Sequence, residues 1–135
     1  LNSEAADYKL AGSAANARLS DLHWPLDLVW LGMGADGHTA SIFPGSDYEE
    51  ALNPAKGVRA IGVRPDPFPP EAPVDRVTLT VPAIVEARTT MLVIIGAEKQ
   101  QVLEQAIEEG KKSAYPVGRV IDALTVPVDI YCLSV

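Results

Sequence analysis

The sequence alternates short apolar runs with segments of helical periodicity, and this order constrains the fold more than any other feature. Short apolar runs bounded by turn residues are typical of strands, whereas apolar residues at every third or fourth position indicate helices. The predicted strands are Leu26–Leu31, Val58–Val63, Arg76–Val81, Met91–Ile95 and Val128–Leu133. The predicted helices cover residues 4–20, Pro82 to about Ala87, Ala97–Glu109 and Pro116–Leu124.

Strands that alternate with helices predict an α/β fold with a mostly parallel sheet and flanking helices. The 135 residues, 47% of them hydrophobic, suffice for one core, so residues 1–135 are predicted to form a single α/β domain. The run Leu26–Leu31 ends in glycine and is expected to be a strand buried on both faces. Trp30 is therefore expected in the core or at an interface, and Cys132 as a small buried hydrophobe.

Composition limits the classes of partner. A net charge of −7 with dispersed acidic residues disfavours non-specific nucleic-acid binding, which needs a basic surface. No apolar stretch is long enough to span a bilayer, so no membrane partner is expected. The single cysteine excludes an internal disulfide and a multi-cysteine metal site, and the expected compartment is the reducing cytoplasm. A small anionic ligand stays possible, because two or three cations can hold one phosphate.

The segment after the first predicted strand reads LGMGADGHTASIFPG. Its residues Gly32, Gly34 and Gly37 satisfy the G-x-G-x-x-G pattern of dinucleotide-binding sites. That motif needs a long helix opening at the third glycine. Pro44 stops such a helix, so residues 38–43 are predicted to form little more than one helical turn. The pattern therefore does not indicate a dinucleotide site.

Two interpretations of this loop stay open from its residues alone. In the structural one, Asp36 caps a turn and His38 is merely exposed. In the catalytic one, His38 accepts a proton near neutral pH and Asp36 holds its imidazole in one tautomer. Main-chain N–H groups of Gly34, Gly37 or the 39–41 turn would then face a developing oxyanion. Such a set suits water attack on an ester or lactone, or proton transfer on a sugar.

Two blocks of the sequence, Leu31–Gly45 and Arg76–Pro82, and the layout between them resemble the family of 6-phosphogluconolactonases and glucosamine-6-phosphate isomerases. The resemblance extends through the closing strand and covers nearly the whole chain. It is carried by Leu31–Gly45, by Arg76–Pro82 with Ala87-Arg88-Thr89 after it, by Gly96 and its helix, and by Tyr115-Pro116-Val117.

The resemblance implies a fold and an activity. Lactonases of this family hydrolyse 6-phospho-D-glucono-1,5-lactone to 6-phosphogluconate in the pentose phosphate pathway, without cofactor or metal, on a doubly wound α/β sheet. His38 would be the base that activates water, and Asp36 would assist it or bind the sugar. The glycines of the loop would let the phosphorylated sugar lactone approach the main chain, namely Gly32, Gly34 and Gly37.

Two alternatives accompany this expectation. A glucosamine-6-phosphate deaminase-like enzyme would carry Asn before Gly-His and Phe-Asn-Glu-Pro after it, whereas this chain has Asp36 and the stretch Thr39–Pro44. The other alternative is a non-catalytic sugar-phosphate-binding domain.

The sequence also departs from the family pattern. Family chains are longer, so this one is expected to be the C-terminal half or somewhat more, without the N-terminal strand, its Ser-Gly-Gly phosphate turn and an early arginine. Glu71 stands where many members have a lysine. Arg64 or Arg76 is therefore expected to bind the phosphate, although Arg76 suits a structural anchor equally well. We expect the chain alone to be poorly active.

Overall fold

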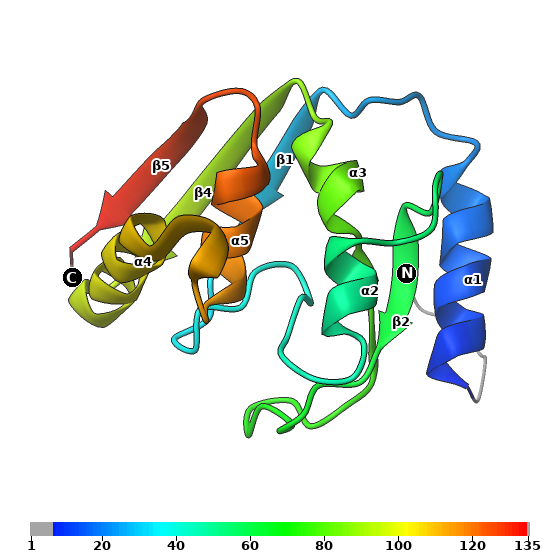
Figure 1. The fold of residues 1–135 in the computed structure, drawn as a ribbon, viewed down its shortest axis with the longest axis horizontal. Helices are drawn as coiled ribbons and strands as arrows, with labels where there is room; N and C mark the ends of the chain where they lie inside the picture. The colour runs from blue at the N-terminus through cyan, green and yellow to red at the C-terminus, as the bar shows by residue number, and fades with distance from the viewer. Residues whose placement is uncertain (1–6, 135) are drawn as a thin grey trace. The chain divides into compact units, whose positions relative to one another are not determined.

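The computed structural model describes residues 7–134, which divide into two compact units (Figure 1). Unit 1 comprises residues 7–24 and 41–83, and unit 2 comprises residues 25–40 and 84–134. The division falls within the short helix α3 (Val81–Val85). The first residues of the helix predicted over 4–20 lie outside the described part of the chain.

Unit 2 contains a parallel three-stranded sheet in the order β1 (Leu28–Leu31), β4 (Thr89–Ile95) and β5 (Val128–Leu133). In its register Leu28 lies opposite Thr89, and Thr90 lies opposite Val128. Figure 1 shows α4 (Ala97–Glu109) and α5 (Pro116–Ala123) on the same side of this sheet, joined by the 3-10 turn η1 (Gly110–Lys112). A parallel sheet with flanking helices confirms the predicted α/β class.

The helices of unit 2 begin and end where the sequence dictates. Glycines with positive φ bound α4 at both ends, Gly96 at its N-cap and Gly110 at its C-cap. Pro116 occupies the first turn of α5, where its missing N–H costs no helical hydrogen bond. Leu103 and Ala106 are the buried positions of α4.

One face of this sheet is open, and two predictions about its strands are wrong, namely that Leu26–Leu31 is buried on both faces and that Cys132 is buried. We call this the open sheet face, and its exposed members are Leu28, Trp30, Ile95, Tyr131 and Leu133. Trp30 is 67% exposed and is not in the core, because β1 alternates exposed and buried residues instead of being buried on both faces. Cys132 is exposed as well, because β5 is an edge strand of the sheet.

Unit 1 packs α1 (Tyr8–Leu19) against β2 (Ala60–Val63), which pairs with β3 (Arg76–Leu79). This pairing is antiparallel, which the prediction of a mostly parallel sheet did not anticipate. All four residues of β2 are buried. Asn16 ties α1 to the start of β2, because its Oδ1 accepts hydrogen bonds from the amides of Arg59 (2.7 Å) and Ala60 (3.1 Å).

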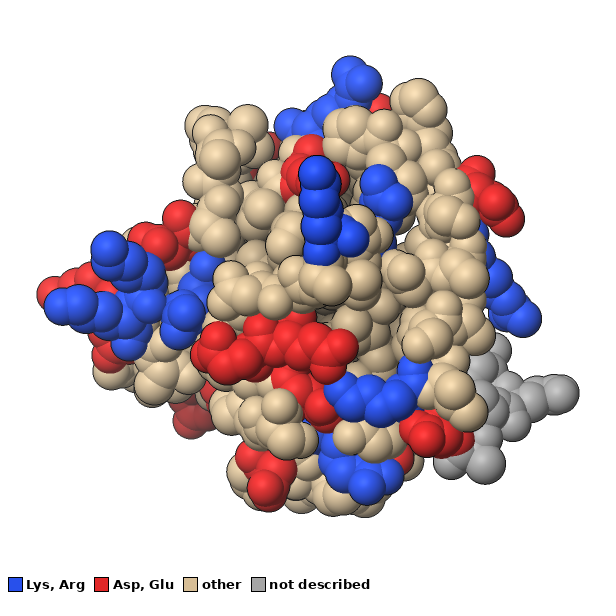
Figure 2. Space-filling model, turned by 45° about the vertical axis from the view of Figure 1, so that its right-hand side comes forward, with Lys and Arg blue, Asp and Glu red and all other residues tan. Residues whose placement is uncertain are grey.

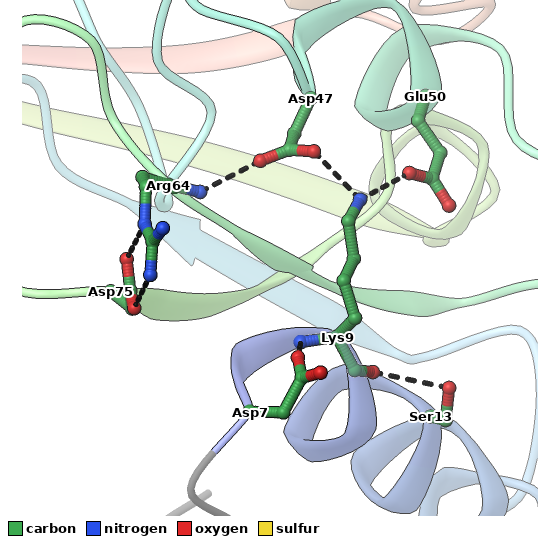
Figure 3. Close-up of polar contacts among 7 residues, drawn as sticks. All are labelled: Asp7, Lys9, Ser13, Asp47, Glu50, Arg64 and Asp75. Carbon is green, nitrogen blue, oxygen red and sulfur yellow. Dashed lines mark hydrogen bonds and ion pairs between the residues drawn. The ribbon is translucent and has the colours of Figure 1, made fainter.

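A polar network joins α1 to α2 (Tyr48–Leu52) in unit 1 (Figure 3). The ammonium of Lys9 donates to Asp47 Oδ1 at 2.6 Å and to Glu50 Oε2 at 2.7 Å. The second oxygen of Asp47 accepts the amide of Arg64 at 2.8 Å. Burial alone raises the pKa of Asp47, but the hydrogen bonds from Lys9 and from the Arg64 amide outweigh it, so the pKa lies below its usual value.

The surface carries charges of both signs. On the face drawn in Figure 2, acidic and basic side chains gather in small neighbouring groups separated by uncharged surface. Within residues 7–134, no helix combines the length and the apolar character that crossing a membrane requires.

Candidate functional site

Residues 32–40, which we call the glycine loop, follow β1 at its carboxyl end, the edge of a parallel sheet at which ligands commonly bind. The hydroxyl of Thr39 is fully buried and donates to the Gly32 carbonyl at 2.8 Å. This bond brings the end of the loop back to its beginning. Residues 38–43 form no helix, in contrast to the helical turn that the sequence suggested.

Main-chain hydrogen bonds close the loop internally. The Gly34 amide donates to the His38 carbonyl at 2.9 Å, and the Gly37 amide donates to the Gly34 carbonyl at 3.0 Å. The Ser41 amide donates to Thr78 Oγ1 at 3.1 Å within unit 1. These three N–H groups are engaged by protein acceptors in this structure, so they are not available to an oxyanion as they stand.

Asp36 and His38 form a contacting pair. Asp36 Oδ1 accepts the His38 amide at 3.2 Å and lies 2.5 Å from His38 Nδ1. An ionised carboxylate accepts hydrogen bonds and cannot donate them, so this contact favours the imidazole tautomer with its proton on Nδ1. Nε2 is then the ring nitrogen that can accept a proton. The two side chains are 25% and 54% exposed, so solvent reaches the pair.

The imidazole lies directly over Gly34. A Cβ added at Gly34 would collide with Cε1 and Nδ1 of the ring and lie 2.6 Å from Asp36 Oδ1. A Cβ added at Gly32 would meet no atom within 4 Å. The absence of a side chain at Gly34 is therefore a geometric condition for the Asp36–His38 pair.

Arg64 and Arg76 belong to unit 1, whereas the glycine loop belongs to unit 2. Arg64 Nε and Nη2 donate to the two oxygens of Asp75 at 2.7 and 2.6 Å (Figure 3). This hydrogen bonding raises the pKa of Arg64 and lowers that of Asp75. Arg76 Nη2 donates to the Ala72 carbonyl at 2.7 Å, and its guanidinium lies 4.8 Å from the centre of the Phe43 ring. Both guanidinium groups thus make structural contacts.

Two residues outside the predicted site also contact the loop. The Val117 amide donates to the Gly37 carbonyl at 3.0 Å, and the Tyr115 ring lies against the α-carbon of Gly37. In the sequence, Tyr115 precedes the helix-starting Pro116 and belongs to the Tyr115-Pro116-Val117 stretch of the family resemblance. No local signal links it to a loop so distant in the chain. Among residues 7–134, no three His, Cys, Asp or Glu side chains are grouped so that they could hold a metal ion.

Comparison with known proteins finds similar sequences over nearly the whole chain. Residues 1–126 match the family model described as glucosamine-6-phosphate isomerases/6-phosphogluconolactonase. The chain is 37% identical to a 6-phosphogluconolactonase of Mesorhizobium japonicum over 132 residues, which are 97% of this chain and 53% of that protein. It is 37% identical to a 6-phosphogluconolactonase of Rhizobium meliloti over 122 residues, which are 90% of this chain and 51% of that protein.

A solved structure is also similar. The crystal structure of a 6-phosphogluconolactonase from Shewanella baltica superposes with a TM-score of 0.87 at 32% identity, covering 100% of this chain and 55% of that one. The chain thus spans about half the length of the relatives that it matches.

Proposed function

Because the chain belongs to the family of glucosamine-6-phosphate isomerases and 6-phosphogluconolactonases, we propose that it is the part of a lactonase that carries the catalytic base. The proposed reaction is hydrolysis of 6-phospho-D-glucono-1,5-lactone to 6-phosphogluconate, a step of the pentose phosphate pathway. The single observation that carries this proposal is the Asp36–His38 pair, held in a glycine loop at the carboxyl end of a parallel strand.

In the proposed mechanism His38 acts first as a base and then as an acid. Nε2 takes a proton from water while the water oxygen attacks C1 of the lactone, which gives a tetrahedral intermediate. Collapse of the intermediate breaks the bond between C1 and the ring oxygen, and the imidazolium returns its proton to that oxygen. Asp36 keeps Nδ1 protonated and stabilises the imidazolium through the 2.5 Å contact. No metal or cofactor takes part in these steps.

Substrate contacts are also part of the proposal. Of the three glycines expected to contact the substrate, Gly32 is the one that lets a sugar ring approach the main chain, because a Cβ there would meet no atom within 4 Å. His38 occupies the space over Gly34, and Tyr115 occupies the space over Gly37. The assignment of Arg64 and Arg76 to the phosphate rests on the sequence resemblance. Arg76, which donates one hydrogen bond to a main-chain carbonyl, is the better candidate of the two, because Arg64 already holds Asp75 with two nitrogens. We further propose that the reaction takes place in the cytoplasm, as the single cysteine favours.

The proposal is tested in a chimera in which this chain replaces the matching segment of the M. japonicum relative. We expect the chimera to hydrolyse the lactone above the spontaneous rate, measured as proton release. His38→Ala should lower kcat about 10²- to 10⁴-fold, the usual contribution of a general base. His23→Ala, which removes the other histidine of the chain, should leave kcat unchanged.

The same assay separates the alternatives. A chimera that releases ammonia from glucosamine 6-phosphate and leaves the lactone intact would favour the deaminase activity. Full activity of His38→Ala would exclude His38 as the base. The isolated 135-residue chain should turn over slowly at best, and full turnover by that chain would contradict our expectation.

A further inference from the structure

We infer that Tyr115, at the turn between η1 and α5, is a positioning residue for the Asp36–His38 pair. The inference deepens the proposed function, but it rests on contacts within unit 2 that exist whatever the substrate. These contacts converge on Gly37, the one residue that separates Asp36 from His38 in the sequence.

The first step is that Gly37 is restrained by two contacts, a hydrogen bond and an aromatic ring. Its carbonyl accepts the Val117 amide at 3.0 Å, which fixes the peptide plane that leads into His38. A Cβ added at Gly37 would lie 2.6 Å from Tyr115 Cδ1 and 2.8 Å from Tyr115 Cβ, so the tyrosine packs against the bare α-carbon. Gly37 has a φ of +79°, a conformation that glycine adopts easily and other residues rarely do. The loop is thus held at its centre by one hydrogen bond and one ring.

The second step is that the turn carrying Tyr115 is itself fixed. Ser113 is 3% exposed, and its hydroxyl donates to Glu109 Oε2 at 2.9 Å and accepts the Tyr115 amide at 3.1 Å. Gln105 Nε2 donates to the other carboxylate oxygen of Glu109 at 2.8 Å. The hydrogen bonds that Gln105 and Ser113 donate to Glu109 lower its pKa, so this carboxylate stays ionised at neutral pH. A chain of bonds therefore runs from α4 to the backbone of Tyr115.

The third step connects this turn with the imidazole. Asp36 Oδ1 contacts both the amide and Nδ1 of His38, and the two residues flank Gly37. A rotation of the Gly37 backbone would therefore separate the carboxylate from the ring. The loop has its own closing bonds at Gly34, but none of these holds the Gly37 carbonyl. Tyr115 and the Val117 amide supply that restraint from a different part of the chain.

The test reads the tautomer of His38 by ¹⁵N NMR of the imidazole nitrogens in the 135-residue chain at alkaline pH, where imidazoles are neutral. His23 serves as the internal reference. We expect His38 of the unsubstituted chain to show the Nδ1–H form. Tyr115→Ala should shift His38 to an averaged pattern of both tautomers, and Tyr115→Phe should restore the Nδ1–H form because it keeps the ring.

Tyr131→Ala is the matched control, since it removes an exposed tyrosine of the same unit that lies on β5. An unchanged His38 signature in folded Tyr115→Ala would overturn the inference. If Tyr115→Ala does not fold, Ser113→Ala, which releases the amide of Tyr115, takes its place. In that variant loss of the Nδ1–H form supports the inference, and its full retention overturns it.

Kinetics of the chimera add a second readout. Tyr115→Ala should lower kcat roughly 10- to 100-fold with little change in KM, as expected when a catalytic group is displaced by about 1 Å. A rise in KM with unchanged kcat would make Tyr115 a substrate contact and overturn the positioning role. The NMR result decides the inference even if His38→Ala shows that His38 is not the base, so the two failures can be told apart.

Discussion

At the scale of single residues, the position of the His38 ring depends on the side chain that Gly34 lacks. The ring and the Asp36 carboxylate occupy the space that any Cβ at position 34 would need. Gly32 lies two residues earlier in the same loop, and a Cβ there would meet nothing. The two glycines look equivalent in the sequence, yet only one of them is required by the geometry of the pair.

We therefore predict that Gly34→Ala disrupts the Asp36–His38 contact and that Gly32→Ala does not. Gly34→Ala should remove the Nδ1–H signature of His38 in ¹⁵N NMR and lower kcat of the chimera roughly 10- to 100-fold. Gly32→Ala should retain the signature. The values of kcat and KM for the Gly32→Ala chimera report separately on whether a ligand approaches residue 32. Retention of the signature in both variants would contradict the arrangement of the loop.

At the scale of secondary-structure elements, the Lys9–Asp47–Glu50 network connects α1 to α2. Lys9 reaches both carboxylates from the first turns of α1, but the two acceptors differ in environment. The Asp47 side chain is 8% exposed, and its other oxygen holds the Arg64 amide, whereas half of the Glu50 side chain is in water. Because desolvated hydrogen bonds to charged groups contribute more than exposed ion pairs, Asp47 should carry most of the stabilisation.

Asp47→Asn should accordingly lower the free energy of unfolding by about 1–3 kcal/mol at pH 7. The pKa of Asp47 is lowered in the folded chain, so its contribution is present above the ordinary value of 3.8 and is lost as the pH falls through the folded-state pKa. The difference from the unsubstituted chain should therefore shrink below about pH 4. Urea unfolding of both proteins at several pH values measures this difference in unfolding free energy.

Glu50→Gln is the matched control for this network. Its effect should stay within about 1 kcal/mol, because the carboxylate is half exposed. Equal losses for the two variants, or a difference for Asp47→Asn that persists in acid, would contradict the assigned role of Asp47.

The element scale also shows what the sequence could predict. The bounds of α4 and β5 agree with the predicted ranges, because glycines bound the helix and Pro127 precedes the strand. The exposed face of β1 and the exposure of Cys132 were not predicted, because an apolar run does not reveal whether its strand is covered on one face or two. The antiparallel pairing of β2 with β3 was missed for a related reason, since pairing direction depends on the path of the connecting loop.

The candidate site was predictable only where it is local. Asp36 and His38 are two residues apart, so their contact follows from the composition of one turn. The engagement of the Gly34 and Gly37 amides within the loop depends on backbone conformation that the glycines leave undetermined. The contact of Tyr115 with Gly37 joins distant segments, and such contacts leave no periodic signal in a single sequence.

At the scale of the whole molecule, the open sheet face gathers exposed apolar side chains on adjacent strands. Leu28 and Trp30 lie on β1, and Ile95, Tyr131 and Leu133 continue the same face across β4 and β5. Contiguous apolar surface of this kind favours association and dye binding, whereas isolated apolar residues do not. Repulsion between molecules of net charge −7 opposes association, but the apolar side chains of the open sheet face stay exposed.

Trp30→Lys should therefore weaken the binding of 8-anilinonaphthalene sulfonate and reduce concentration-dependent light scattering by the isolated chain. The change in unfolding free energy should be small, about 0.5 kcal/mol, because the side chain is exposed. Leu10→Lys is the control, since it makes the same change of charge at an exposed residue of α1 that lies in unit 1. Equal effects of the two substitutions would show that charge, and not the open sheet face, governs association.

The bond between the Val117 amide and the Gly37 carbonyl has a consequence for the order of events in the cell. The ribosome makes the glycine loop long before it makes α5, so a nascent chain that ends within α4 already holds Asp36 and His38 but lacks the partner of Gly37. The restraint on the Gly37 carbonyl then forms only after α5 has emerged from the exit tunnel. A message cut short within α4 would yield a polypeptide that contains the glycine loop but lacks both contacts that hold Gly37 from outside it.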